Sequence, residues 1–111
     1  MRYNLRHVGA REFSPLTFRE LSAQWLTQKS VLLGDDQDER VVPLLRGVLE
    51  DLRAKPIDEQ WGVVGAVDIT INIVEIDGRR LHIEQESYVG VTIRGDRDLV
   101  DRVAGLVQAR R

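Results

Sequence analysis

The sequence predicts an α+β domain in which three helices pack on one face of an antiparallel sheet built on a long β-hairpin. The hairpin is indicated by Asp77-Gly78, which lies between two runs rich in β-branched residues and suits a type I′ turn. The helices are indicated by apolar residues that recur every three or four positions. The predicted hairpin arms span residues 62–76 and 79–94, and the predicted helices span residues 18–29, 42–54 and 97–109.

A capping box marks the start of the first predicted helix. The hydroxyl of Thr17 can accept a hydrogen bond from the amide of Glu20, whose carboxylate can accept one from the amide of Thr17. Phe18, Leu21 and Trp25 then fall on one helical face. Upstream of this helix, alternating apolar residues suggest an edge strand over residues 2–9.

The second and third helices are indicated by continuous apolar stripes. Pro56 ends the second helix, because proline cannot continue one. Asp96 is expected to cap the third helix. The stripe of the second helix is Val41, Leu44, Leu45, Val48, Leu49 and Leu52, and that of the third is Leu99, Val100, Val103, Leu106 and Val107.

The first hairpin arm alternates apolar and polar residues, but the alternation changes phase at Ile73-Val74. We therefore predict a β-bulge there, which would absorb one extra residue and restore the register. The return arm is expected to be one strand bent near Gly90, in preference to two strands joined by a turn at residues 84–87. With the bulge, one face carries Val67, Ile69, Ile71, Ile76, Leu81 and Ile83, and the other carries Asp68, Thr70, Asn72, His82, Glu84 and Glu86.

Length and composition predict a single domain over residues 1–111. The net charge is −2, which argues against nucleic-acid binding because that needs a basic face. No apolar run is long enough to span a membrane, and the N-terminus lacks the apolar core of a signal peptide. Cysteine is absent, which fits a reducing compartment and a cytoplasmic location. No cofactor-binding motif is present, and no cofactor is expected.

The polar face of the hairpin is the first candidate site. His82 and Glu84 lie two positions apart on one strand, so both side chains point the same way. With Glu86 and Asp68 they could act as a general acid and base or hold a divalent ion. The competing interpretation is a solvated face whose charges keep the sheet soluble. That interpretation is preferred, because a metal site usually has a second His or Cys.

The acidic loop over residues 35–39 is the second candidate site. Asp36 and Asp38 are spaced like the start of a calcium loop, but Val41 and Gly47 occupy positions that would need Gly and Glu. The loop is therefore predicted to cap the following helix, or to present carboxylates to a basic protein surface.

Two aromatic residues are the third candidate. Trp61 lies just before the predicted sheet, and packing is the favoured interpretation of its side chain. Tyr88 falls on the polar phase of the return arm, where an exposed ring would be an interface anchor.

These observations favour a small cytoplasmic protein that binds another protein, which has a basic surface. One version is an inhibitor that covers a basic nuclease-type active site, as bacterial immunity proteins do, by analogy of size and charge. The alternatives are a metal-dependent or acid–base enzyme that uses the polar hairpin face, and a structural homodimer joined through a strand edge or the sheet face. The predicted partner-binding residues are Asp35, Asp36, Asp38, Glu39, Asp68, Glu84, Glu86 and Tyr88.

Overall fold

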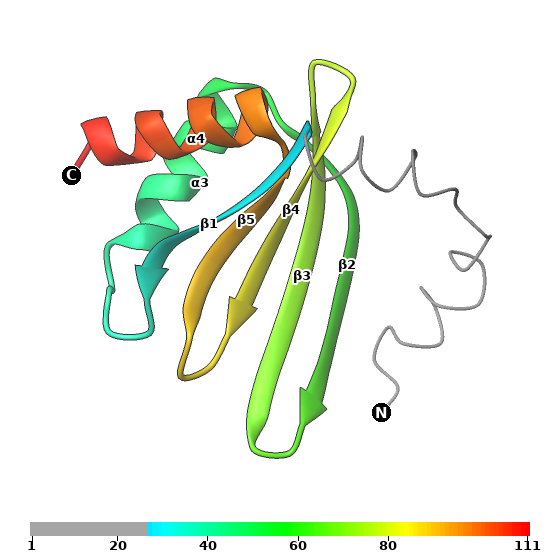
Figure 1. The fold of residues 1–111 in the computed structure, drawn as a ribbon, viewed down its shortest axis with the longest axis vertical. Helices are drawn as coiled ribbons and strands as arrows, with labels where there is room; N and C mark the ends of the chain where they lie inside the picture. The colour runs from blue at the N-terminus through cyan, green and yellow to red at the C-terminus, as the bar shows by residue number, and fades with distance from the viewer. Residues whose placement is uncertain (1–26) are drawn as a thin grey trace.

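The computed structural model describes residues 27–111, which form a five-stranded antiparallel sheet with two helices on one face (Figure 1). The strand order is β1-β5-β4-β3-β2. The predicted strand over residues 2–9 and most of the predicted helix over residues 18–29 lie outside the described residues. The elements are β1 (Gln28–Asp35), α3 (Val41–Asp51), β2 (Lys55–Val64), β3 (Val67–Ile76), β4 (Arg79–Glu86), β5 (Gly90–Asp96) and α4 (Arg97–Ala109).

The core lies between the two helices and one face of the sheet. Leu81, Ile93, Leu99 and Val103 are fully buried there, and burial of such a side chain contributes about 1.5–3 kcal/mol. Neither α3 nor α4, nor any other helix within residues 27–111, is long and apolar enough to cross a membrane. The remaining buried apolar residues are Val41, Leu45, Val48, Val74, Ile76, Ile83, Val91, Val100 and Val107.

Local sequence determines the turn between β3 and β4. Asp77 and Gly78 both adopt positive φ angles, 52° and 79°, as a type I′ turn requires. The hairpin prediction is therefore confirmed at this turn. The helices predicted at residues 42–54 and 97–109 are also present, as α3 and α4.

The predicted fold class is wrong in its strand content and helix count. The described residues hold five strands and two helices on the sheet, not a hairpin with three helices. β1 occupies residues expected to be helix end and loop, and β2 begins at Lys55, between the predicted second helix and the predicted hairpin arm. Both strands are stabilised by pairing with a distant strand, β1 with β5 and β2 with β3, so their own residues carry little indication of them.

The return arm is two strands and not one bent strand. A turn over residues 87–89 separates β4 from β5, and Tyr88 takes a φ of 70° there. The chain reverses, so that Glu86 pairs with Gly90. The alternative with a turn at residues 84–87 was not preferred because those residues include no Gly, Pro, Asn or Asp, and the turn itself contains only Ser87 of the usual turn residues.

The predicted β-bulge at Ile73-Val74 is also wrong. β3 pairs with β4 without interruption, so Asn72 lies opposite Ile83 and Ile71 lies opposite Glu84. The register shifts lie elsewhere, between Leu32 and Gly34 in β1 and between Pro56 and Asp58 in β2. Because the pleat has a period of two, this register divides the residues predicted for each face between the two faces.

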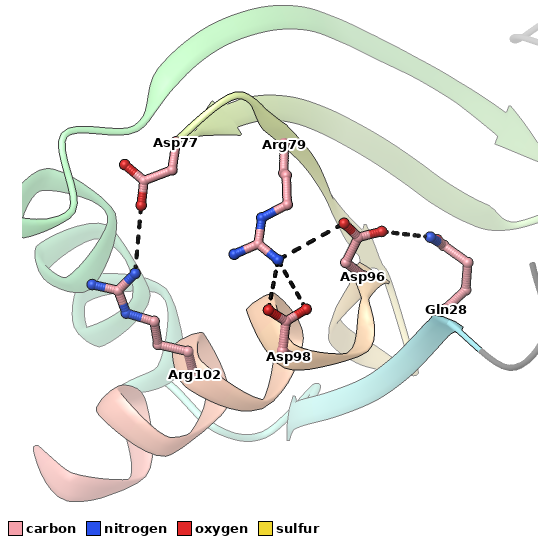
Figure 2. A network of polar contacts seen from close by, with 6 residues as sticks. All are labelled: Gln28, Asp77, Arg79, Asp96, Asp98 and Arg102. Atoms are coloured by element: carbon pink, nitrogen blue, oxygen red, sulfur yellow. Dashed lines mark hydrogen bonds and ion pairs between the residues drawn. The ribbon is translucent and has the colours of Figure 1, made fainter.

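A network of ion pairs joins the elements where β5 runs into α4 (Figure 2). Arg79 lies between two carboxylates, 2.7 Å from Asp98 and 3.9 Å from Asp96. Gln28 donates a hydrogen bond of 2.8 Å to Asp96, and Arg102 lies 3.6 Å from Asp77. Hydrogen bonding to Arg79 lowers the pKa of Asp98. The carboxylates at this end of the sheet therefore have polar or basic partners.

Two glycines allow a prediction about stability: Gly90, which packs against β1, and Gly105, which lies in α4. Gly90 has a φ of 128°, and a Cβ atom there would lie 2.1 Å from the carbonyl oxygen of Gly34. We expect Gly90→Ala to lower the free energy of unfolding by about 3 kcal/mol or more. Gly105 lies within α4 with no atom near its Cβ position, so Gly105→Ala should raise that free energy by about 0.5–1 kcal/mol.

Urea unfolding of the two variants and the wild type measures both effects. A Gly90→Ala variant as stable as the wild type would contradict the described register of β1 against β5.

Candidate functional site

A hollow of about 340 Å³ lies where the acidic loop meets the ends of β3, β4 and β5. The first turn of α3 forms one side of it, through Val41 and Val42. We call this feature the acidic hollow, because five of its lining residues are carboxylic acids and none is Lys or Arg. The lining residues are Asp35, Asp36, Asp38, Val41, Val42, Asp68, Thr70, Gln85, Glu86, Ser87, Gly90 and Val91.

One carboxylate of the acidic hollow has a basic partner. Arg111 lies 2.9 Å from Asp38 and also donates a hydrogen bond of 2.8 Å to the carbonyl oxygen of Leu33. The hydrogen bond from Arg111 lowers the pKa of Asp38. Within residues 27–111, no ion pair joins the other four carboxylates, which are Asp35, Asp36, Asp68 and Glu86.

Backbone contacts hold the β3 side of the hollow in place. The amide of Asp68 donates a 2.8 Å hydrogen bond to Oγ of Ser87, whose own amide donates to the carbonyl oxygen of Asp68. On the loop side, Asp35 accepts a hydrogen bond from the amide of Gln37. The carboxylates therefore project from a fixed backbone, while the Asp68 side chain is exposed.

Two exposed apolar side chains of β2 flank the acidic hollow. Trp61 pairs with Thr70 and Val63 pairs with Asp68, so both lie beside residues that line the hollow. Trp61 is 71% exposed and Val63 is 49% exposed. The packing interpretation of Trp61 is therefore wrong. Tyr88, in the turn before β5, is 73% exposed, as expected for an interface anchor.

A second hollow, of about 290 Å³, lies between α3 and the sheet. Its α3 side includes Leu45 and Leu49, and its sheet side includes Val74 and Ile83. We call it the apolar hollow. Its other lining residues are Val42, Arg46, Glu50, Ala54, Pro56, Asn72 and Gln85.

The polar face predicted for the hairpin does not exist as one surface. Asp68 and Thr70 line the acidic hollow and Asn72 lines the apolar hollow, all on the helix side of the sheet. His82, Glu84 and Glu86 pair with Ile73, Ile71 and Ile69, which lie on the other side, and Glu86 also borders the acidic hollow because it is the last residue of β4. Asp68 therefore cannot act together with His82 and Glu84. Within residues 27–111, no group of three or more His, Cys, Asp or Glu side chains could hold a metal ion.

On that other face, Glu84 interacts with a cation from the neighbouring strand. Arg94 donates hydrogen bonds of 2.9 and 3.2 Å to Oε2 of Glu84. Burial, and then the positive charge of Arg94, lower the pKa of His82, while Glu84 acts in the opposite direction. His82 is thus held toward its neutral form beside an ion pair.

The structure gathers five of the eight predicted partner-binding residues around one hollow. Glu39 remains an exposed residue of the loop, Glu84 lies on the far face, and Tyr88 lies in the neighbouring turn. The sequence analysis placed Thr70 on one face with Asp68, and it named Trp61 as a candidate but favoured packing. Gln85 is the lining residue of β4 that it did not name; the alternation of Leu81, Ile83 and Gln85 along β4 indicates its side of the sheet.

Comparisons with protein-family models, curated proteins and solved structures found no significant match. The function is therefore argued from the charge and shape of the two hollows.

The lowered pKa of His82 predicts a pH effect on stability. Below about pH 6.5, the unfolded chain binds a proton at this residue that the folded chain resists binding. Stability should therefore fall as the pH drops from about 6.5 through the folded-state pKa. We expect His82→Gln to lose less unfolding free energy than the wild type between about pH 7.5 and about pH 5.5.

Urea unfolding at the two pH values compares the proteins, which share all other titrating groups. Equal losses would show that His82 does not contribute to this pH dependence.

Proposed function

We propose that this protein is a binding module that uses the acidic hollow to hold a basic surface of another protein. The observation that carries the proposal is the set of four carboxylates without a cationic partner within residues 27–111, gathered from the acidic loop, β3 and β4. Close like charges repel one another, and a cationic partner relieves that repulsion. A complementary field also accelerates association with such a partner.

The surroundings of the hollow suit an Arg or Lys side chain of the partner. A guanidinium can donate two parallel hydrogen bonds to a carboxylate such as Asp68 or Glu86. The exposed indole of Trp61 offers a face for cation–π contact, worth about 0.5–2 kcal/mol. An exposed Trp beside a charged hollow also has the character of a binding hot spot.

An inhibitor of immunity type is the more specific form of this proposal. Such a protein would cover the basic active site of a toxin nuclease, and its support is the negative charge of the acidic hollow, which is not paired within residues 27–111 except at Asp38. A cytoplasmic location is the setting that we expect for it.

Capture from a lysate of the organism that makes the protein tests the role of the acidic hollow. The baits are the tagged wild type and a variant with Asp36→Asn, Asp68→Asn and Glu86→Gln. We expect the wild type to recover a basic protein in stoichiometric amount, and the variant to bind it at least about tenfold more weakly, since on-rates depend on the local field. Raising the salt from about 0.1 M to about 1 M should also release it, because the Debye length falls from about 10 Å to about 3 Å.

A matched variant removes three carboxylates elsewhere on β2, β3 and the β3–β4 turn, through Asp58→Asn, Glu75→Gln and Asp77→Asn. It changes the net charge equally, so it should keep the partner. The proposal fails if no protein separates the two variants, or if both lose the partner equally.

The alternative functions receive less support from the geometry. An acid–base enzyme that uses His82, Glu84, Glu86 and Asp68 together receives less support, because the register separates Asp68 from His82 and Glu84. A homodimer through the edge of β2 would have to overcome Pro56, the register shift after it and the charges of Asp58 and Glu59, all of which oppose edge pairing. The homodimer stays a prediction, which sedimentation against concentration can decide.

A further inference from the structure

The two hollows lie side by side. Val42 of α3 and Gln85 of β4 line both of them, so these residues mark where the acidic hollow meets the apolar hollow. We call the two hollows together the trough. It runs along α3, from the acidic loop before the helix to Ala54 in the chain that leaves it.

The lining of the trough changes from acidic at one end to apolar at the other. At the start of α3 it is lined by the carboxylates of Asp36, Asp68 and Glu86. Toward the end of α3 it is lined by Leu45 and Leu49, with Pro56 and Val74 facing them from the sheet, and Arg46 and Glu50 offset each other in charge. A ligand that fills the trough therefore needs positive charge at one end and apolar groups at the other.

The sheet beside α3 is wide enough to carry one more α-helix. In Figure 1, α3 and α4 lie toward the β1 edge of the sheet, while β2 and the start of β3 extend beyond them. Two strands at a spacing of about 4.8 Å make a strip about 10 Å wide, which is the diameter of a helix with its side chains. Trp61 projects from the helix side of β2, as its pairing with Thr70 shows, and would flank a helix laid along this strip.

We propose that the trough binds an amphipathic α-helix of the basic partner, which lies beside α3 as a third member of the helix layer. This inference rests on the proposed function, and it names the part of the partner that docks. The basic residues of that helix lie over the acidic hollow, and its apolar residues lie between Leu49 and Val74. Charge complementarity selects a cationic helix over an acidic one.

The length of the trough limits the docking helix. Val42 and Leu49 are seven residues apart on α3, which is about 10 Å, and the acidic loop extends the trough further. About three helical turns would span it. The apolar anchors would follow a spacing of three or four residues, with the basic residues one or two turns away.

Two labelled synthetic peptides of about 14 residues test the proposal by fluorescence anisotropy with the full chain. Both contain Leu, Lys and Ala in the same proportions. The first places Leu at helical spacing in one half and Lys at helical spacing in the other, with Ala at the remaining positions, and the second has the same residues in scrambled order. We expect the ordered peptide to bind at least about tenfold more tightly than the scrambled one, because only the ordered peptide presents an apolar face.

Two substitutions test whether the ordered peptide binds in the trough or elsewhere on the surface. Leu49→Lys places a charge in the apolar hollow and should abolish the preference for the ordered peptide. Leu32→Lys makes the same change at a side chain that is 53% exposed on β1 and should leave binding unchanged. Circular dichroism checks that each variant folds. Trp61→Ala, at a side chain mostly exposed to solvent, should weaken the ordered peptide several-fold if Leu49→Lys does not fold.

Each remaining outcome overturns the trough proposal. Equal binding of both peptides, sensitive to Asp68→Asn and Glu86→Gln but not to Leu49→Lys, would leave the acidic hollow as a binding surface without a docked helix. Failure of both peptides to bind would also overturn it, while the capture experiment would still test the acidic hollow. Tighter binding by a Leu21→Asp variant would assign the trough to the protein's own residues 1–26.

Discussion

The unbroken pleat of β3 is the constraint on which the rest of the surface depends. Val74 and Ile76 are buried against the helices, and a strand alternates its faces at every residue. Asp68, Thr70 and Asn72 must then lie on the same side as the core. They can remain there because they line open hollows instead of a closed interior. Burial of the apolar second half of β3 fixes which face each residue lies on, and this places the polar residues of its first half in the trough.

The same constraint explains the character of the opposite face. Ile69, Ile71 and Ile73 form a half-buried row on β3, beside His82 and Glu84 on β4. On this face Glu84 of β4 pairs with Arg94 of β5, and the carboxylate of Asp68 lies on the other side of the sheet. The helix side instead gathers acidic residues from segments far apart in the sequence.

The elements that sequence analysis predicted are those with local causes. The Asp77-Gly78 turn needs two positive φ angles, and α4 carries its apolar stripe within one segment. β1 and β2 were not predicted, because their stability comes from pairing with β5 and β3, which lie far away in the sequence or follow later in it. The register of β3 was predicted wrongly because the change of phase at Ile73-Val74 was attributed to a bulge. The strand instead keeps one register, with Asn72 opposite Ile83, and Asn72 borders an open hollow. The acidic loop was recognised, but its meeting with Asp68 depends on that register.

Acidic residues at the two ends of the sheet differ in their ion pairing, and this difference supports the proposed binding role. At the end shown in Figure 2, Asp98 and Asp77 each lie near an arginine. At the other end, Asp38 alone of the hollow's carboxylates has such a partner within the described chain. Like charges held close together on a fixed backbone reduce stability, and within residues 27–111 the ion pairs of Arg79, Arg94 and Arg102 lie elsewhere. Features that cost stability without a local gain concentrate at functional sites, so the four carboxylates that lack a cation within these residues support the proposed binding of a basic partner.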